Sequence, residues 1–242
     1  MWHLGRMCGF DLETTGVDVE TDRIVTACVV GCGGGPATES RTWLADPGIE
    51  IPDGAAQVHG ITTERARAEG RPAADVVAEV VTALASAARD GEPIVAMNAA
   101  YDLTLLDREC QRHGIKSLWD YTDSIPCVID VKVLDKHIDR YRKGSKRLED
   151  LCQLYGVRLD GAHSADGDAI AACRVAWRIG SMRPELAALP MDVLHEQQVA
   201  WAAEHAESLA AHFASTPGKE HQAAGVRTDW PFIPRQQIGD PR

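Results

Sequence analysis

The sequence predicts an α/β domain built on a mixed sheet that helices flank. Its N-terminal part contains three short apolar segments separated by turns, a pattern typical of an antiparallel meander. Two further apolar segments follow, the first of which leads into a helical pattern, as in α/β units. Of the 242 residues, 45% are hydrophobic and 25% are charged, the composition of a globular chain with one sizeable core.

The first three strands open the chain. Residues 8–12 form the first, because apolar residues occupy every second position there. Residues 23–31 are a continuous apolar run rich in β-branched residues, which suits a central strand buried on both faces. A glycine-rich turn at residues 31–36 then leads to a strand at residues 41–45. No Gly-Lys-Ser/Thr follows these glycines, so the turn is not expected to be a phosphate loop.

The segment after the meander is predicted to be irregular as far as Thr62, because turn signals at residues 46–48 and 52–54 interrupt it. His59 belongs to this loop region. A helix follows from Pro72 to Arg89, with Pro72 at its first position. The apolar stripe of this helix, at spacings of three and four, consists of Val76, Val77, Val80, Val81 and Leu84.

The second group of strands lies in the middle of the chain. Residues 93–97 are predicted to form a short buried strand, and Asn98 to be the N-cap of a helix that Gly114 ends. One face of that helix is marked by Leu103, Leu106 and Cys110. Residues 127–131 are the fifth predicted strand, which gives a five-stranded sheet.

Three helices and a tail complete the chain. The first helix covers residues 148–155, and the second runs from the region of Asp168 to about Gly180. The packing stripe of the second is Ala169, Ala172, Cys173, Ala176 and Ile179. The last amphipathic helix spans residues 191–214, and its inward candidates are Val193, Gln197, Ala200, Trp201, Ala203 and Leu209. The tail is rich in Pro and Gly, and we expect it to be irregular and partly mobile.

These elements predict three parts. Residues 1–182 form the main domain, residues 183–214 a C-terminal helical extension, and residues 215–242 an irregular tail. No internal repeat is visible.

Composition excludes several classes of protein. No apolar run reaches the roughly 18 residues of a membrane-spanning helix, so no membrane partner is expected. The first strand begins so early that a signal peptide has no room. The seven cysteines include no C-x-x-C pair, which favours reduced thiols in a cytoplasmic protein over disulfides or zinc. The net charge of −11 disfavours broad coating of nucleic acid, unless a local basic groove or a metal ion overrides it.

Two acids on the first strand are the first candidate for chemistry. Asp11 and Glu13 lie two residues apart, so their side chains share one face. Two adjacent carboxylates resist ionising together, and a divalent cation between them removes that conflict. An acidic edge strand in contact with water is the alternative reading, since Asp-x-Glu alone is a weak signal.

Two further acids and a histidine occupy positions near helix starts. Asp102 falls in the first turn after a strand, which is where ligands collect in open α/β sheets. Alternatively, its negative charge could only stabilise the helix through the helix dipole, by about 0.3–1 kcal/mol. His163 and Asp168 cannot face the same way within one helix, because five residues turn through about 500°. With His163 in the lead-in loop and Asp168 in the first turn, both can point at one site.

The segment from Lys132 to Arg147 reverses the charge of the chain locally. Seven cations face only Asp135 and Asp139, which leaves 7 − 2 = +5. The cations are Lys132, Lys136, Arg140, Arg142, Lys143, Lys146 and Arg147. This segment is either a solvated helical face or a track for a phosphate backbone.

Three motifs in order make the chain resemble the DEDDh family of 3′–5′ exonucleases, to which the epsilon subunit of bacterial DNA polymerase III belongs. They are the segments FDLETTG from Phe10, NAAYD from Asn98, and HSADGDA from His163, the last containing the family's His-x4-Asp. The segment VHGI around His59 is also similar to the family. The resemblance covers about residues 6–182 and implies a ribonuclease H-like fold.

The resemblance also implies a set of roles. Asp11, Glu13, Asp102 and Asp168 would be catalytic and would hold two ions, Mg²⁺ or Mn²⁺, with His163 as the general base. The enzyme would release nucleoside 5′-monophosphates from the 3′ end of DNA. Substrate contacts are expected at Thr14, Thr15, His59, Asn98 and Tyr101, and in the basic segment at Arg140, Arg142 and Lys143.

Several alternatives stay open. An exoribonuclease of the same fold is one, since RNA and DNA are distinguished by a few 2′-OH contacts. A non-catalytic binding subunit that keeps the fold is another, although all four acids and His163 are present. A hydrolase of small phosphoesters is a third. The resemblance implies a DNA polymerase or other replication protein as partner, with a stand-alone repair or nucleotide-turnover enzyme as the equal alternative.

Overall fold

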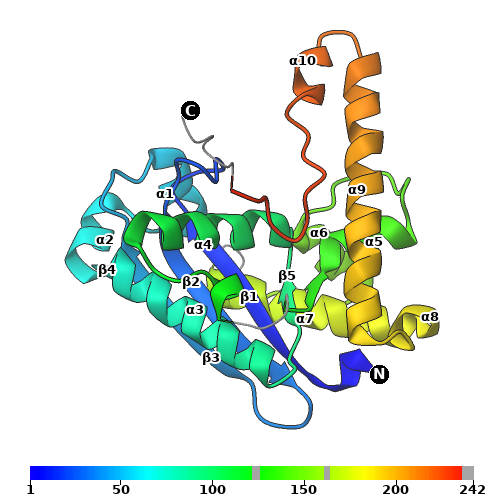
Figure 1. Ribbon diagram of the computed structural model, residues 1–242, viewed down its shortest axis with the longest axis horizontal. Coiled ribbons are helices and arrows are strands. Elements are labelled where there is room, and N and C mark those ends of the chain that lie inside the picture. Colours follow the sequence, from blue (N-terminus) through cyan, green and yellow to red (C-terminus); the bar gives the residue numbers. More distant parts are fainter. Residues whose placement is uncertain (122–125, 161–163, 236–242) are drawn as a thin grey trace, which may run out of the picture.

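The computed structural model of the protein describes residues 1–121, 126–160 and 164–235 (Figure 1). Its centre is a mixed sheet of six strands in the order β4-β3-β2-β1-β5-β6. The five predicted strands are all present. The sixth, β4 (Arg71–Pro72), has only two residues and is too short to produce any periodicity in the sequence.

The meander forms one half of the sheet. Strands β1 (Arg6–Thr14), β2 (Ile24–Gly33) and β3 (Glu39–Asp46) pair antiparallel in sequence order. The predicted turn at residues 31–36 begins later than expected, because β2 continues to pair with β1 as far as Gly33.

The other half of the sheet is parallel. Strand β5 (Ile94–Ala96) pairs parallel with β1, and β6 (Val128–Asp130) pairs parallel with β5. Their carboxyl ends therefore meet at one edge of the sheet. Helix α4 (Ala99–His113) leaves β5 at this edge, and α5 (Val131–Ile138) leaves β6.

Helices cover both faces of the sheet (Figure 1). Helix α3 (Ala73–Arg89) and α4 pack on one face, where Phe10 and Leu12 point. The predicted stripe of α3 is fully buried. Pro72 precedes α3 as its N-cap residue and does not occupy the first helical position.

The opposite face carries α7 (Ala165–Met182), α6 (Leu148–Tyr155), α8 (Pro184–Ala187) and the short 3₁₀ helix η1 (Trp2–Leu4). The predicted packing stripe of α7 is buried throughout. A second 3₁₀ helix, η2 (Leu118–Asp120), follows α4.

The prediction of an irregular segment before Thr62 is wrong. Helices α1 (Asp53–His59) and α2 (Thr63–Glu69) form there. Gly60 ends α1 with a φ of 75°, and the Thr62 hydroxyl caps α2 by accepting from the Arg65 N–H. His59 is thus the last residue of a helix and does not lie in a loop.

Helix α9 (Met191–Ser215) seals the β6 edge of the sheet. The Gln198 side chain accepts from the Asp130 N–H at 2.8 Å and donates to the Val128 carbonyl at 2.9 Å, and so replaces a neighbouring strand. The buried residues of α9 are Leu194, Gln198 and His205. The predicted inward face is therefore right at Trp201, which packs against both cores, and wrong at Ala200 and Leu209, which are exposed.

The tail returns to the domain. Helix α10 (Glu220–Ala223) lies against α9, and the chain then runs back beside α9 to reach α4 (Figure 1). Trp230 is buried, Phe232 stacks on Trp119 with ring centroids 4.3 Å apart, and Arg235 binds Asp107 at 2.7 Å. Residues 230–235 therefore pack against the domain, and the expectation of a partly mobile tail stays a prediction.

Two further observations concern residue classes. All seven cysteines are free thiols. Within the described residues, each helix is too short or too polar to span a bilayer.

Candidate active site

Three carboxylates from two elements meet at the carboxyl edge of the sheet. Asp11 and Glu13 come from β1, and Asp168 comes from the first turn of α7. One oxygen from each lies within 4.8 Å of the others. The predicted pair on β1 and the predicted third acid are therefore brought together.

Gly9 makes this approach possible. A Cβ at position 9 would lie 2.7 Å from the Ala169 carbonyl and 2.8 Å from the Cys173 sulfur, both on α7. Because Gly9, Asp11 and Glu13 alternate along β1, they share the face that α7 covers. The missing side chain lets the start of α7 lie close enough for Asp168 to reach the β1 acids.

Asp102 is a fourth acid near this group of three, close enough for its charge to act on Asp11. It lies in the first turn of α4 and is buried. Burial, and then the charges of Asp102, Asp168 and Glu13, raise the pKa of Asp11 well above its usual range. Burial also raises the pKa of Asp102, with Asp130 and Glu13 adding to the effect and backbone hydrogen bonds opposing it. The four acids therefore act on one another electrostatically.

This donor set fits hard divalent cations. Carboxylate oxygens are the ligands that Mg²⁺ and Mn²⁺ prefer. Without a cation these acids repel one another, and the raised pKa values of Asp11 and Asp102 favour the protonated forms of those two. Positive charge among them would relieve both the desolvation and the repulsion.

Asp130 organises the edge on which the acids lie, although it belongs to none of the three motifs. This buried carboxylate ends β6 and accepts from the N–H groups of Asn98 and Ala99 at 3.1 and 2.9 Å. It also caps α5 by accepting from Lys132 and Val133. One side chain thus fixes the starts of both α4 and α5. The sequence signal that could have indicated this capping role is an Asp at the end of a predicted strand.

Asn98 is the N-cap residue of α4, as predicted, but its side chain makes no capping hydrogen bond. Its backbone is left-handed, with a φ of 73°, and Asp130 satisfies the first N–H groups of the helix instead. The Asn98 side-chain oxygen accepts from the Lys132 ammonium at 3.0 Å. The amide is therefore held at the surface beside the start of α4.

The predicted contacts around β1 lie beside the cluster. The Tyr101 hydroxyl donates to the Gly16 carbonyl at 2.5 Å and lies 2.7 Å from the Thr14 hydroxyl, which joins α4 to the end of β1. Thr15 is 2% exposed, and its hydroxyl donates to Asp22 at 2.7 Å. Thr14 and Tyr101 thus hold the end of β1 against α4, and Thr15 supports the following loop; the predicted contact of all three with substrate stays a prediction.

His59 shares a cavity of about 210 Å³ with Glu13 and Ser164, which places the end of α1 beside the cluster. Its Nδ1 accepts from the Ile61 N–H at 3.2 Å, so the proton of the neutral ring lies on Nε2. Burial lowers the pKa of His59, and the nearby Thr14 backbone opposes that shift. His163 lies outside the described residues.

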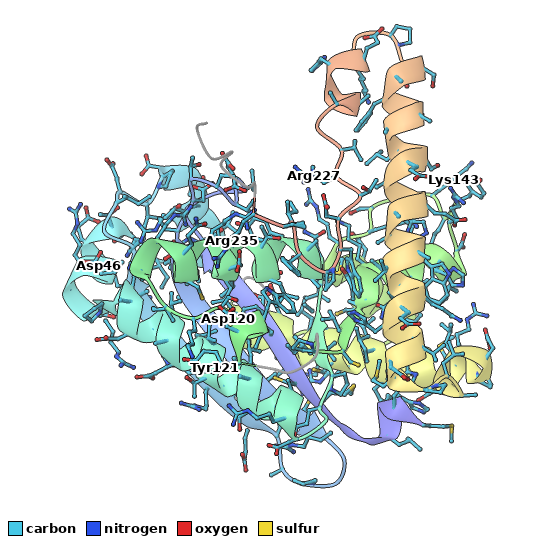
Figure 2. The ribbon with its side chains drawn as sticks, viewed as in Figure 1. Asp46, Asp120, Tyr121, Lys143, Arg227 and Arg235 are labelled. Carbon is cyan, nitrogen blue, oxygen red and sulfur yellow. The ribbon has the colours of Figure 1, made fainter. Side chains whose placement is uncertain are left out.

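The predicted basic contacts differ in their surroundings. Arg142 donates to Asp135 at 2.8 Å, and Asp135 is buried, so this guanidinium has a structural partner. Arg140 lies 3.9 Å from Glu204 on α9. Lys143 is exposed and, in Figure 2, lies across α9 from Arg227 on the tail. The predicted substrate role of these three residues stays a prediction.

The fold and the acid cluster together define a class of protein. The chain belongs to the exonuclease family (RNase_T), whose model matches residues 8–176 and so includes all four acids. The protein is therefore a nuclease.

Curated relatives are replication proteins. The chain is similar to the DNA polymerase III subunit epsilon of Aquifex aeolicus, with 25% identity over 72% of this chain and 80% of that protein. It is also 28% identical to the PolC-type DNA polymerase III of Lacticaseibacillus paracasei, over 66% of this chain. The matched part spans only 10% of that polymerase.

Solved structures of exonuclease I have a similar fold. The complex of the E. coli enzyme with a dT13 oligonucleotide has a TM-score of 0.64 and 18% identity, over 75% of this chain and 42% of that one. Exonuclease I from Methylocaldum szegediense has a TM-score of 0.63 and 19% identity, over 87% of this chain and 46% of that one. The predicted fold is therefore confirmed.

Proposed function

We propose that this protein is a metal-dependent 3′–5′ exonuclease that releases nucleoside 5′-monophosphates from DNA. The observation that carries the proposal is the meeting of Asp11, Glu13 and Asp168 within 4.8 Å, beside buried Asp102, in a chain of the exonuclease family. The similarity to a polymerase III epsilon subunit and to exonuclease I, which has been solved with dT13, supports DNA as the substrate.

The four acids would hold two divalent ions, Mg²⁺ or Mn²⁺. When bound, the ions would supply positive charge at the scissile phosphate and make a water molecule more acidic. The contribution of the chain is to fix these carboxylates in advance. Asp130 anchors the start of α4, which carries Asp102, and Gly9 admits α7, which carries Asp168.

The remaining groups would position the 3′-terminal nucleotide. Thr14 and Tyr101 hold the loop after β1, and His59 faces the cavity beside Glu13. Asn98 lies next to the start of α4, with its amide oxygen held by Lys132. These polar groups surround the acids on several sides, as a site that orients one nucleotide requires.

His163 is proposed as the general base. Its imidazole would accept a proton from the attacking water, since it titrates nearest neutrality. We expect His163→Ala to lower the single-turnover rate by about 10²–10⁴-fold while metal affinity stays close to wild type. Asp168→Ala should weaken metal binding and cleavage together. Equal loss of metal in both variants, measured by calorimetry, would show that His163 is a ligand or a structural residue.

We propose that the chain has three parts: a main domain at residues 1–182, an extension at residues 183–214 and a tail at residues 215–242. A polymerase partner is one proposal for the assembly, and stand-alone action in repair or nucleotide turnover is the other. Co-purification with a polymerase III catalytic subunit separates the two.

The decisive experiment is digestion of 5′-labelled DNA and RNA, single- and double-stranded, with Mg²⁺ or with EDTA. We expect stepwise shortening of DNA from a free 3′ end, release of 5′-mononucleotides, and no reaction in EDTA. Glu207→Gln, an exposed change on α9, is the control for Asp11→Asn. Cutting of circular DNA, or equal cleavage of a 3′-blocked strand, would contradict the polarity. Preference for RNA would favour the exoribonuclease alternative.

A further inference from the structure

A cleft of about 460 Å³ adjoins the active site outside the proposed catalytic groups. It lies between α5, α9 and the returning tail. Its lining starts with Asn98 and Asp130 at the carboxyl edge of the sheet and extends to Arg227 on the tail. The cleft is therefore continuous with the edge that carries Asp102, although part of its wall comes from residues beyond the family match.

The floor of this cleft is cationic. Lys132 and Lys136 from α5 line it together with Arg227 from the tail. His205 from α9 also lines it, but burial lowers the pKa of this ring to about 4, so that it is neutral near pH 7. Burial lowers the pKa of Lys136, and the neighbouring charges of Lys146, Lys132 and Arg140 lower it further. Positive charges are thus concentrated here in a chain whose net charge is −11.

The nearby acids pair with Arg227 but leave the two lysines of the floor without an ion pair in the described part of the chain. Among the ion pairs found in the described parts of the chain, none includes Lys132 or Lys136. Asp229 in the lining is bound to Arg227 at 2.8 Å. Asp130 is occupied by the backbone N–H groups that it caps. An anionic ligand would therefore complement the floor.

The walls are apolar and aromatic. Phe213 and Leu209 of α9 face the cleft together with Val226 and Trp230 of the tail. Leu209 is 39% exposed, so part of its apolar surface is available to a ligand in the cleft. Single-stranded nucleic acid presents apolar base faces along an anionic backbone, and the proteins that bind it combine cations with aromatic side chains.

We propose that this cleft binds the single-stranded nucleic acid that leads to the 3′ end in the active site. The proposal rests on the proposed function and names the surface that holds the rest of the substrate. The cleft contacts phosphates through Lys132, Lys136 and Arg227. The tail is then part of the substrate-binding surface.

The test compares Lys136→Glu and Lys136→Ala with Lys116→Glu. Lys116 is an exposed cation beyond the far end of α4, a helix of 15 residues and thus about 22 Å long. The substrates are a thymidine dinucleotide and an oligothymidylate about a dozen nucleotides long. The readout is the ratio of their kcat/KM values, long over short, which cancels effects on the chemical step.

We expect Lys136→Glu to lower this ratio at least tenfold. The salt slope is the steepness with which log(kcat/KM) for the long strand falls with log[salt]. Lys136→Ala should reduce this slope by about 0.7, the value for one phosphate contact on a single strand. Lys116→Glu should keep the wild-type ratio and slope. An unchanged ratio in Lys136→Glu, with a folded circular dichroism spectrum, overturns the proposal. If Lys136→Glu does not fold, Lys136→Ala decides by its salt slope.

Binding in EDTA separates this proposal from the proposed function. Fluorescence anisotropy of labelled DNA and RNA oligomers should show weaker binding by Lys136→Glu than by wild type, whether or not wild type cleaves either strand. Absence of cleavage by wild type, with this difference intact, refutes the proposed function and leaves the cleft assignment standing. Equal binding of an acidic peptide of the same charge would refute the cleft as a nucleic-acid site.

Discussion

The hydrogen bond between Trp230 and Asp130 is expected to couple the tail to the active-site edge. Trp230 donates through Nε1 to the Asp130 carboxylate at 3.2 Å, and both residues are buried. That carboxylate also accepts from Ala99 at 2.9 Å at the start of α4, the helix that carries Asp102. Loss of the tail contact should therefore affect both stability and the cluster.

The magnitude follows from the bonds involved. Trp230→Phe removes a hydrogen bond to a carboxylate and keeps most of the aromatic packing. We expect this change to lower the free energy of unfolding by about 1.5–3 kcal/mol. Asp130→Asn puts an NH₂ donor where a carboxylate oxygen accepted hydrogen bonds, so backbone N–H groups on at least one side lose their acceptor. We expect these unsatisfied groups and the weakened helix caps to lower the free energy of unfolding by about 2–4 kcal/mol. The double variant should show a coupling energy of about 1–2 kcal/mol, because the two residues share one bond.

The assay is urea unfolding of wild type, both single variants and the double variant. Trp177→Phe is the matched control, since Trp177 is 44% exposed on α7 and should change stability by less than about 0.5 kcal/mol. A coupling energy indistinguishable from zero would refute the reasoning. So would a Trp230→Phe variant as stable as Trp177→Phe.

Three other predictions concern the charged groups. Asp11→Asn should abolish cleavage, because it removes a charge proposed to hold the ions; most of the wild-type turnover at saturating Mn²⁺ would refute the two-metal assignment. Without metal, the raised pKa values of Asp11 and Asp102 mean that the folded state holds protons that the unfolded state releases. The contribution of these two acids to the free energy of unfolding is therefore largest in acid and falls as pH rises above about 4, by up to about 1.4 kcal/mol per pH unit for each proton; Mg²⁺ should flatten this fall, measured in urea titrations as the difference between wild type and Asp11→Asn. Arg142→Ala should destabilise by about 2–3 kcal/mol, since it leaves buried Asp135 with weaker partners, whereas exposed Lys143→Ala should not; equal midpoints of thermal unfolding would contradict this.

The strands and the acid positions were predictable because the signals are local. Alternation along residues 8–12 places Asp11 and Glu13 on one face whatever the rest of the chain does. A glycine after a helical stripe ends α4, and the acid in the first turn of α4 follows a buried strand. Short range and strong periodicity explain why these predictions hold.

The features that failed depend on long-range contacts. Helices α1 and α2 have seven residues each, too few for a periodic pattern. Helix α9 turns the polar residue Gln198 toward the sheet, because the amide of Gln198 completes the hydrogen bonds at the edge of β6. A hydrophobicity pattern assigns a glutamine to the exposed face and therefore misses this position. The Asp130 cap of α4 joins residues 31 positions apart, so local capping rules assign the role to Asn98.

The tail gives the clearest case of such a long-range effect. Its composition predicts irregular structure, and residues 226–235 are indeed neither helix nor strand. Irregular backbone is nevertheless held where its side chains find buried partners, as Trp230 does on Asp130, Phe232 on Trp119 and Arg235 on Asp107. The family match ends at residue 176, yet the network that fixes the start of α4 ends in this tail. A variant truncated after the family match would therefore lose the Gln198 seal on β6 and the Trp230 contact together, and its inactivity alone would say nothing about the acids themselves.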